Sequence, residues 1–263
     1  MDASAGWMFS TNNSFIGIDP TAGQRPFTYA AIDHELHLLA IGQGDMDEVL
    51  AFVAGQRYAL VAVSAPRRPN QGAMERPEVR ERLSPRPRPG RWTNFRLVEY
   101  LLRQHNITIP QTPSQESECP GWMRMGFKLY HRLEGLGYKP FPQEEAAHQW
   151  LEVYPHACFA ALLGCLPFPK HTLEGRLQRQ LVLYEQKMEI ADPMRIFEEI
   201  TRHRLLQGIL PAEEILHPEE LDALVAAYTA RAAATQPDQV VLLGDQIEGQ
   251  IVVPVPELKT RYK

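Results

Sequence analysis

The stretch Phe15-Ile16-Gly17-Ile18-Asp19-Pro20 is the starting point for interpreting this sequence. Its apolar run has the composition of a short buried strand, and the run ends on an acid followed by proline. A strand-end acid points into the crevice at the carboxyl edge of an α/β sheet, where ligands usually bind. The alternative for Asp19 is an ordinary turn aspartate before proline.

The next segments predict two strands, a helix and a further strand before residue 66. They are strands 27–32 and 36–41, a helix over 46–54, and strand 58–63. Three meandering strands, a crossover helix and a fourth strand beside the first are the opening of a ribonuclease H-like domain. We therefore expect an α/β protein built on such a mixed sheet.

Residues 66–147 interrupt this alternation, and we interpret them as an Arg/Pro-rich and partly helical insertion after the fourth strand. We expect a single ribonuclease H-like domain over residues 1–263, with the order β-β-β-α-β-α-β-α. The remaining expected elements are helices at 93–105 and 121–133, a strand at 149–159, helices from about 173, at 192–208 and at 218–234, and a hairpin of 240–243 with 250–255.

Composition limits the class of protein. Hydrophobic residues make up 44% of the 263, so a sizeable core is available and wholesale disorder is excluded. The net charge of −5 excludes a protein that is basic throughout. Residues 66–91 nevertheless hold eight arginines against three glutamates, a local charge of about +5.

The cysteines and the hydropathy pattern indicate a cytoplasmic protein. The three cysteines are odd in number and form no C-x-x-C pair, which favours a reducing compartment. No run of 18 apolar residues is present, so we expect no membrane association. The N-terminal residues lack the basic and apolar regions of a signal peptide.

Three acids stand out against their surroundings. Asp19 ends the first strand, and Glu152 lies in an apolar strand where period two places it on the face of Trp150 and Tyr154. A buried carboxylate there needs a cation, a hydrogen-bond donor or a proton. Asp222 lies beside the apolar stripe of the last long helix; alternatively, it is a first-turn acid that complements the helix dipole.

Acids that converge from different elements repel one another unless a cation joins them. Mg²⁺ accepts a few carboxylates and keeps several waters, and paired metals can activate water and stabilise the leaving oxygen of a phosphodiester. We therefore predict that Asp19, Glu152 and Asp222 are catalytic residues that converge on Mg²⁺ or Mn²⁺.

Basic residues near these acids are candidate substrate ligands. Arg67 and Arg68, in the Arg/Pro-rich segment, could grip phosphates, and Trp92 could stack a base. Lys170 and Arg176 lie near the start of a helix and could neutralise phosphate. The alternatives are a solvated loop and ordinary surface helix residues.

Five motifs, in order along most of the chain, resemble the domain of unknown function 429 family of predicted nucleases. They are Gly17-Ile18-Asp19, Glu152-Val153-Tyr154-Pro155, Lys170-His171-Thr172 with Gly175-Arg176, Glu220-Leu221-Asp222-Ala223-Leu224-Val225-Ala226-Ala227, and Gly244-Asp245-Gln246-Ile247-Glu248-Gly249. The resemblance implies a ribonuclease H-like fold and metal-dependent nuclease activity.

One position departs from the family pattern. The fourth strand of the family usually ends in Asp before a small residue and Pro, whereas this chain has Ser64 before Ala65 and Pro66. Serine is a poorer Mg²⁺ ligand than a carboxylate, which argues for one metal rather than two. We expect Ser64 at the rim of the crevice, among the substrate-binding residues.

Two main hypotheses follow, a metal-dependent nuclease and a non-catalytic nucleic-acid or ligand-binding protein of the same fold. A phosphotransferase is a third, since Asp19-Pro20-Thr21-Ala22-Gly23 faintly resembles the phosphate loop of actin-like kinases. The absence of an internal repeat argues against it. The form of nucleic acid and the oligomeric state do not follow from the sequence.

Overall fold

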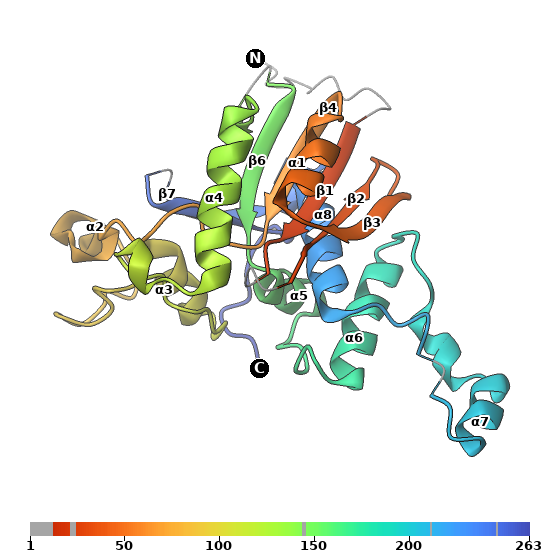
Figure 1. The fold of residues 1–263 in the computed structure, drawn as a ribbon. Coiled ribbons are helices and arrows are strands. Elements are labelled where there is room, and N and C mark those ends of the chain that lie inside the picture. Colours follow the sequence, from red (N-terminus) through yellow and green to blue (C-terminus); the bar gives the residue numbers. More distant parts are fainter. Residues whose placement is uncertain (1–12, 22–24, 144–145, 211, 246) are drawn as a thin grey trace, which may run out of the picture.

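One mixed β-sheet runs through the computed structural model, which describes residues 13–21, 25–143, 146–210, 212–245 and 247–263 (Figure 1). The sheet order is β3-β2-β1-β4-β6-β8-β7, and β5 pairs with β6 beside this path. The strands are β1 Asn13–Asp19, β2 Phe27–Ile32, β3 Leu38–Gly44, β4 Tyr58–Val63, β5 Lys139–Pro140, β6 His148–Val153, β7 Val241–Asp245 and β8 Gly249–Val253.

The central strands run in one direction. β4 is parallel to β1, β6 is parallel to β4, and β8 is parallel to β6, whereas β2 is antiparallel to both β1 and β3. The carboxyl ends of β1, β4 and β6 therefore meet at one edge of the sheet. In register across them lie Ile18, Val63 and Glu152.

Helices cover both faces of the sheet, with α8 on one face and α1 and α4 on the other (Figure 1). The helices are α1 Met46–Ala54, α2 Pro77–Glu81, α3 Leu97–Gln104, α4 Gly121–Gly135, α5 Pro155–Leu163, α6 Leu173–Glu185, α7 Glu199–Leu206 and α8 Pro218–Thr235, with short 3-10 turns η1 Ala73–Glu75, η2 Glu116–Glu118, η3 Pro193–Phe197 and η4 Pro237–Gln239. None of the helices within the described ranges is long and apolar enough to cross a membrane.

The backbone of α8 lies directly on β1 at Gly17. A Cβ atom at this position would lie 1.9 Å from the carbonyl oxygen of Ala223, so only glycine fits there. Alanines on the facing side of α8, such as Ala226 and Ala227, permit the same close approach. This contact brings the first turns of α8 to the carboxyl end of β1.

Most expected elements are present, and several of them have shifted ends. The expected strand 149–159 is wrong in its second half, because β6 ends at Val153 and α5 begins at Pro155. Strand β3 begins later than expected because Asp33 Oδ1 accepts the N–H groups of Glu35 and His37 and thereby extends the turn.

The predicted helix over 192–208 is interrupted. Asp192 does cap its start, by accepting the N–H of Met194, but the chain turns extended at Glu198 and separates η3 from α7. This part of the chain projects from the body of the molecule (Figure 1). Several large apolar side chains are exposed there, namely Met194, Phe197, Leu205, Leu206, Ile209 and Leu210.

Candidate functional site

Asp19 and Asp222 form a buried acidic pair at the carboxyl end of β1. Asp19 follows Gly17 by two residues and so lies on the face of the sheet that α8 covers. Asp222, in the second turn of α8, is only 6% exposed. Burial and the charge of Asp222 raise the pKa of Asp19 to about 7, despite the opposing charge of Lys170. Asp19 therefore titrates near neutral pH, and the two acids repel each other when both are ionised.

Lys170 supplies the positive charge that the pair does have. Its Nζ lies 2.6 Å from Oδ2 of Asp222. Burial raises the pKa of Asp222, and Lys170 and the more distant Arg179 counteract this effect. Lys170 comes from the segment between α5 and α6, and its side chain is partly exposed. The ammonium group of Lys170 can therefore move away from Asp222 without unfolding a helix.

Two groups at the start of α5 have shifted pKa values. Burial, followed by the charge of Asp222, raises the pKa of Tyr154 to about 12. Burial and the charges of Arg179 and Lys170 lower the pKa of His156, so this imidazole is neutral at pH 7. A neutral imidazole and a phenol at the start of α5 therefore border the acidic pair.

Glu152 does not join this pair. Its carboxylate makes two bonds to Arg96, at 2.7 and 2.9 Å, and both side chains are almost fully buried. The strand register explains the separation. Glu152 is level with Ile18, and both side chains lie on the face of the sheet that α4 covers. Asp19 is one residue further along β1, so its side chain lies on the opposite face, under α8. In place of three converging acids, the described residues hold an acidic pair and a separate ion pair.

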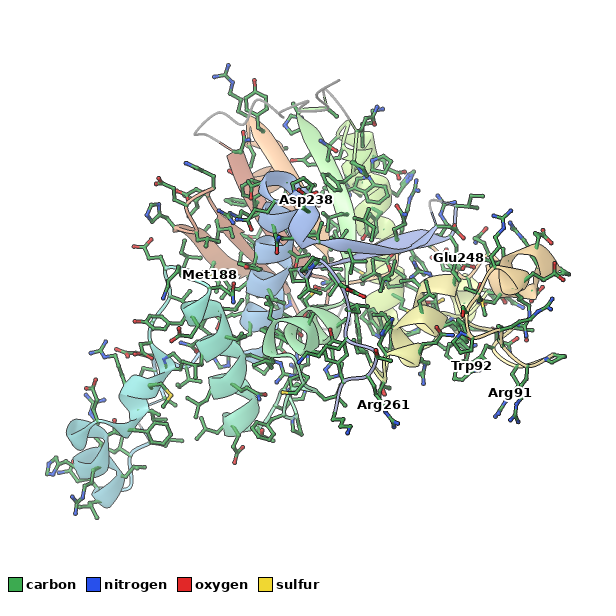
Figure 2. The ribbon with its side chains drawn as sticks, turned by 180° about the vertical axis from the view of Figure 1, so that it is seen from behind. Arg91, Trp92, Met188, Asp238, Glu248 and Arg261 are labelled. Atoms are coloured by element: carbon green, nitrogen blue, oxygen red, sulfur yellow. The ribbon has the colours of Figure 1, made fainter. Side chains whose placement is uncertain are left out.

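The Arg96–Glu152 pair belongs to a buried network that attaches the segment after β4 to the sheet. Glu248 accepts the backbone N–H groups of Gln71, Ala73 and Leu97. Figure 2 labels Glu248 beside this part of the insertion. Sequence reasoning missed the network, because Glu248 lies in a hairpin motif whose spacing does not reveal a buried acid.

Glu99 extends this network on the other side of Arg96. It accepts the N–H and hydroxyl of Thr112 and the N–H of Arg96. Burial nevertheless raises the pKa of Glu99 to about 7. The network therefore contains a carboxyl group that titrates near neutral pH.

Ser64 lies between the two clusters. It directly follows β4, and its N–H donates to the carbonyl oxygen of Ile18 at 2.9 Å. Its hydroxyl oxygen is buried and has no hydrogen-bond partner within the described ranges. Ser64 lines a small cavity together with Arg96 and Glu152, so it borders the ion pair as well as the end of β1.

The arginines expected to bind phosphate, Arg67, Arg68 and Arg176, lie in different surroundings. The guanidinium of Arg67 lies 4.7 Å from the centre of the Trp150 ring and bonds Glu134 at 2.7 Å. Burial and neighbouring Arg67 lower the pKa of Arg68. Arg176 donates to the carbonyl oxygens of residues 215 and 216, ahead of α8, and is thus used to hold that loop.

Another group of potential ligands lies on the turn between β2 and β3. Atoms of Asp33, Glu35 and His37 lie within 4.8 Å of one another. Asp33 Oδ1 already accepts backbone N–H groups, and its Oδ2 lies 2.9 Å from Nδ1 of His37. These contacts account for the turn by themselves.

The donor set of Asp19 and Asp222 fits a hard divalent cation. Mg²⁺ is commonly held by one or two carboxylates together with waters and substrate phosphates, and Mn²⁺ takes similar oxygen ligands. Glu152 could act as a ligand only if Arg96 released it. The residues present therefore fit a single ion at the acidic pair.

The fold and site define a mixed α/β protein with paired buried acids at the carboxyl edge of its central strand. A family model described as protein of unknown function (DUF429) matches residues 17–248, and the chain belongs to this family. The predicted membership of the domain of unknown function 429 family is thereby confirmed. None of the curated proteins and none of the solved structures matches the chain.

Proposed function

We propose that this chain is a ribonuclease H-like, divalent-metal-dependent nuclease that holds one Mg²⁺ or Mn²⁺ between Asp19 and Asp222. The order β3-β2-β1-β4-β6, with β2 antiparallel to its neighbours and β4 and β6 parallel to β1, supports the fold assignment. The crossover from β3 through α1 to β4 agrees with the expected topology.

The acidic pair is the observation that carries the proposal. Two buried carboxylates lie at the end of a central strand with Lys170 bonded to only one of them, and the pKa of Asp19 is raised to about 7, so the two acids repel each other when both are ionised. A divalent ion would relieve this repulsion and would supply an activated water and charge stabilisation at a phosphodiester.

The chain's own residues would then have distinct tasks. Asp19 and Asp222 bind and orient the ion, and Lys170, released from Asp222, neutralises a substrate phosphate. The neutral imidazole of His156 is available to accept a proton nearby. Because Glu152 is held by Arg96 and Ser64 replaces an acid, one ion fits this site better than two.

The arginines of the insertion support nucleic acid as the substrate. Arg76, Arg82, Arg88 and Arg91 are exposed and make no ion pair within the described residues. Arg80 instead donates to the carbonyl oxygens of residues 74, 88 and 91 and so shapes the segment that presents them. Figure 2 labels Arg91 at the outer side of this projecting segment.

Trp92 lies in the same segment, but its ring already packs against two other aromatic rings. Its ring packs edge-on against Phe95 and Tyr100, with centroids 5.0 and 5.8 Å apart. The basic surface of the four exposed arginines therefore provides phosphate contacts without base-specific readout, which is the usual division of tasks at such interfaces.

A nuclease panel with Mg²⁺ or Mn²⁺ tests the proposal on single-stranded DNA, duplex DNA, RNA and an RNA–DNA hybrid. Wild type should cleave at least one substrate, and Asp19→Asn and Asp222→Asn should lose cleavage. Asp47→Asn, an exposed aspartate bonded to Arg132, is the matched control and should behave as wild type. The proposal is contradicted if wild type cleaves none of the substrates, or if Asp19→Asn cleaves as fast as wild type.

The second candidate is a nucleic-acid-binding protein without catalysis. Ser64 at the end of β4 and the occupied carboxylate of Glu152 favour it, because they leave fewer acids for metal. Calorimetry separates the two candidates. Nucleic-acid binding without Mg²⁺ or Mn²⁺ uptake supports the non-catalytic protein, whereas metal uptake lost in Asp222→Asn supports the nuclease. The phosphate-loop resemblance at 19–23 includes residues 22 and 23, which lie outside the described residues.

A further inference from the structure

Residues 192–210, which contain η3 and α7, project from the body of the molecule as an arm (Figures 1 and 2). We call this segment the α7 arm. Its helix α7 has eight residues, and η3 is its only extensive neighbour among the helices and strands of the described chain. Isolated helices shorter than about 12–15 residues are marginal in water. The arm therefore lacks the packing partner that normally stabilises so short a helix.

Exposed apolar side chains are concentrated on this arm. Phe197 is 70% exposed and Leu206 is 81% exposed. Single exposed apolar residues are normal on a soluble protein, whereas a concentration of them marks an interaction surface. Of the eleven large apolar side chains that are exposed within the described ranges, six belong to the α7 arm, namely Met194, Phe197, Leu205, Leu206, Ile209 and Leu210.

The charges of the arm do not favour a charged partner. Arg195 lies 3.7 Å from Glu198 and 3.0 Å from Glu214, and Arg204 lies 3.8 Å from Glu213. Residues 192–210 contain three arginines and three acids, so their formal charges cancel. Nucleic acids and anionic membranes attract an excess of basic residues, which this arm does not have. Its partner should therefore be apolar and without a strong net charge at the contact.

The shape of the apolar surface favours a second arm over a flat surface. Leu205 and Leu206 are consecutive residues of α7, so their side chains diverge by about 100° around the helix axis. A flat partner such as a lipid surface covers one side of a helix. A second arm packed alongside, together with the body of its own chain, can cover both directions.

The amount of apolar surface agrees with a dimer. The six side chains are exposed by close to half or more, which amounts to on the order of 600 Å² per copy for side chains of this size. Two copies together then offer on the order of 1,200 Å², the lower end of what specific interfaces bury. A twofold dimer reaches this area because the same surface is used on both subunits.

We propose that the α7 arm is a dimerisation element, and that two copies of this chain pack their arms against each other about a twofold axis. An antiparallel alignment brings the start of one arm, at Phe197, to the end of the other, at Leu206 and Ile209. No residue of the arm belongs to the Asp19–Asp222 pair, so the proposal does not depend on nuclease activity.

Sedimentation velocity of the full chain over about 1–100 µM tests the proposal, because this range covers dissociation constants of typical small interfaces. Wild type should sediment at twice the chain mass at the upper concentrations. Leu206→Glu and Phe197→Glu each place a charge in the apolar contact, and each should raise the dissociation constant at least about tenfold. Ile247→Glu, at an exposed isoleucine between β7 and β8, is the matched control and should dimerise as wild type.

Amide hydrogen exchange gives a second measurement that needs no loss of folding. The amides of residues 194–210 should exchange more slowly in the wild-type dimer than in Leu206→Glu. Because Phe197 and Leu206 are exposed in the single chain, neither glutamate should unfold it, and circular dichroism checks this.

The proposal is overturned if wild type is monomeric at about 100 µM, or if it forms a dimer that Leu206→Glu and Phe197→Glu both leave unchanged. Equal dissociation by Ile247→Glu would also overturn it, because the effect would then not belong to the arm. A monomer that instead binds phosphatidylcholine vesicles, and loses this binding in Leu206→Glu, would identify lipid as the partner and contradict the dimer.

Discussion

Two of the buried acids bond directly to a cation, whereas two other acids with raised pKa values do not. Glu152 has the guanidinium of Arg96, and Asp222 has the ammonium of Lys170. Asp19 and Glu99 lack so close a cation, and each has a pKa of about 7. Burial is the largest cause of the raised pKa of both Asp19 and Glu99.

The raised pKa of Asp19 predicts a pH-dependent effect of Asp19→Asn. The folded protein binds a proton at Asp19 below about pH 7, whereas the unfolded chain does so only below about pH 4. The stability associated with this proton is present at low pH and is lost as the pH rises through 7. Without divalent metal, Asn should raise Tm at pH 8 by a few degrees, since about 1 kcal/mol shifts Tm by roughly 2–4 °C in a chain of this size.

Calorimetric unfolding at pH 5 and pH 8 measures this effect. The difference between Asp19→Asn and wild type should be small at pH 5 and should favour the variant at pH 8. Asp47→Asn should give no such pH dependence. A Tm difference that is the same at both pH values would show that charge repulsion at Asp19 is not the cause.

Breaking the Arg96–Glu152 pair should destabilise the fold strongly. Arg96→Met leaves a buried carboxylate without its cation, which typically costs about 3–5 kcal/mol. Replacing both residues by methionine should recover a large part of this loss, because no buried charge then remains. Urea unfolding measures both, with Arg132→Met as an exposed control expected to cost at most about 1 kcal/mol. A double variant no more stable than Arg96→Met would contradict this account.

At the residue scale, the sequence identified the unusual acids better than their partners. Asp19, Glu152 and Asp222 stand out because each is an acid among apolar neighbours, and all three are indeed largely or partly buried. Arg96 has no such signal, since an arginine before a helix is ordinary on a surface. Whether two acids share a face depends on the register between strands, which local spacing does not contain.

At the scale of elements, apolar periodicity predicted the existence of most strands and helices. The predicted ends were wrong where side chains form hydrogen bonds with the backbone. Strand β2 and strand β4 begin and end where predicted, because hydrophobic burial alone defines them. β3 is displaced by the hydrogen bonds of Asp33, and α3 starts only after Arg96, whose N–H bonds Glu99. The two-residue β5 has too few residues to give a periodic signal.

The contact between β1 and α8 predicts the effect of Gly17→Ala. The added methyl group would lie 1.9 Å from the backbone oxygen of Ala223, so the helix must move. Overpacking of this kind typically costs about 1–3 kcal/mol. Gly135→Ala is the matched control, because no atom lies within 4 Å of its added Cβ and the residue is helical.

Denaturant unfolding of both variants measures the difference. Gly17→Ala should be destabilised, whereas Gly135→Ala should be unchanged or slightly more stable, as alanine favours helix. A Gly17→Ala protein as stable as the control would mean that α8 can move away from β1 without cost.

At the scale of the whole molecule, the exposed arginines lie on a segment that projects from the sheet, on the side away from α7 (Figure 1). Each phosphate contact reduces the logarithm of the binding constant by about 0.9 per unit of log salt for duplex DNA. Four arginines are replaced by glutamine in the test variant, namely Arg76, Arg82, Arg88 and Arg91. The slope of log K against log salt should therefore become shallower by up to about 3–4.

Fluorescence anisotropy with labelled duplex DNA at several salt concentrations measures this slope. Arg57→Gln is the control, since Arg57 is exposed at the start of β4, at the opposite end of that strand from the insertion. An unchanged slope in the fourfold variant would exclude this segment as the phosphate-binding surface.

The positions of α8 and β8 determine when the fold can form during synthesis. α8 covers β1 and contributes to the central core, and β8 pairs directly with β6, yet both lie between residues 218 and 253. The apolar α8-facing side of β1 therefore stays uncovered until the ribosome has made nearly all of the described chain. Such long-range closure is slow and leaves hydrophobic surface open to aggregation. Nascent chains of this protein should consequently depend on chaperones until α8 emerges.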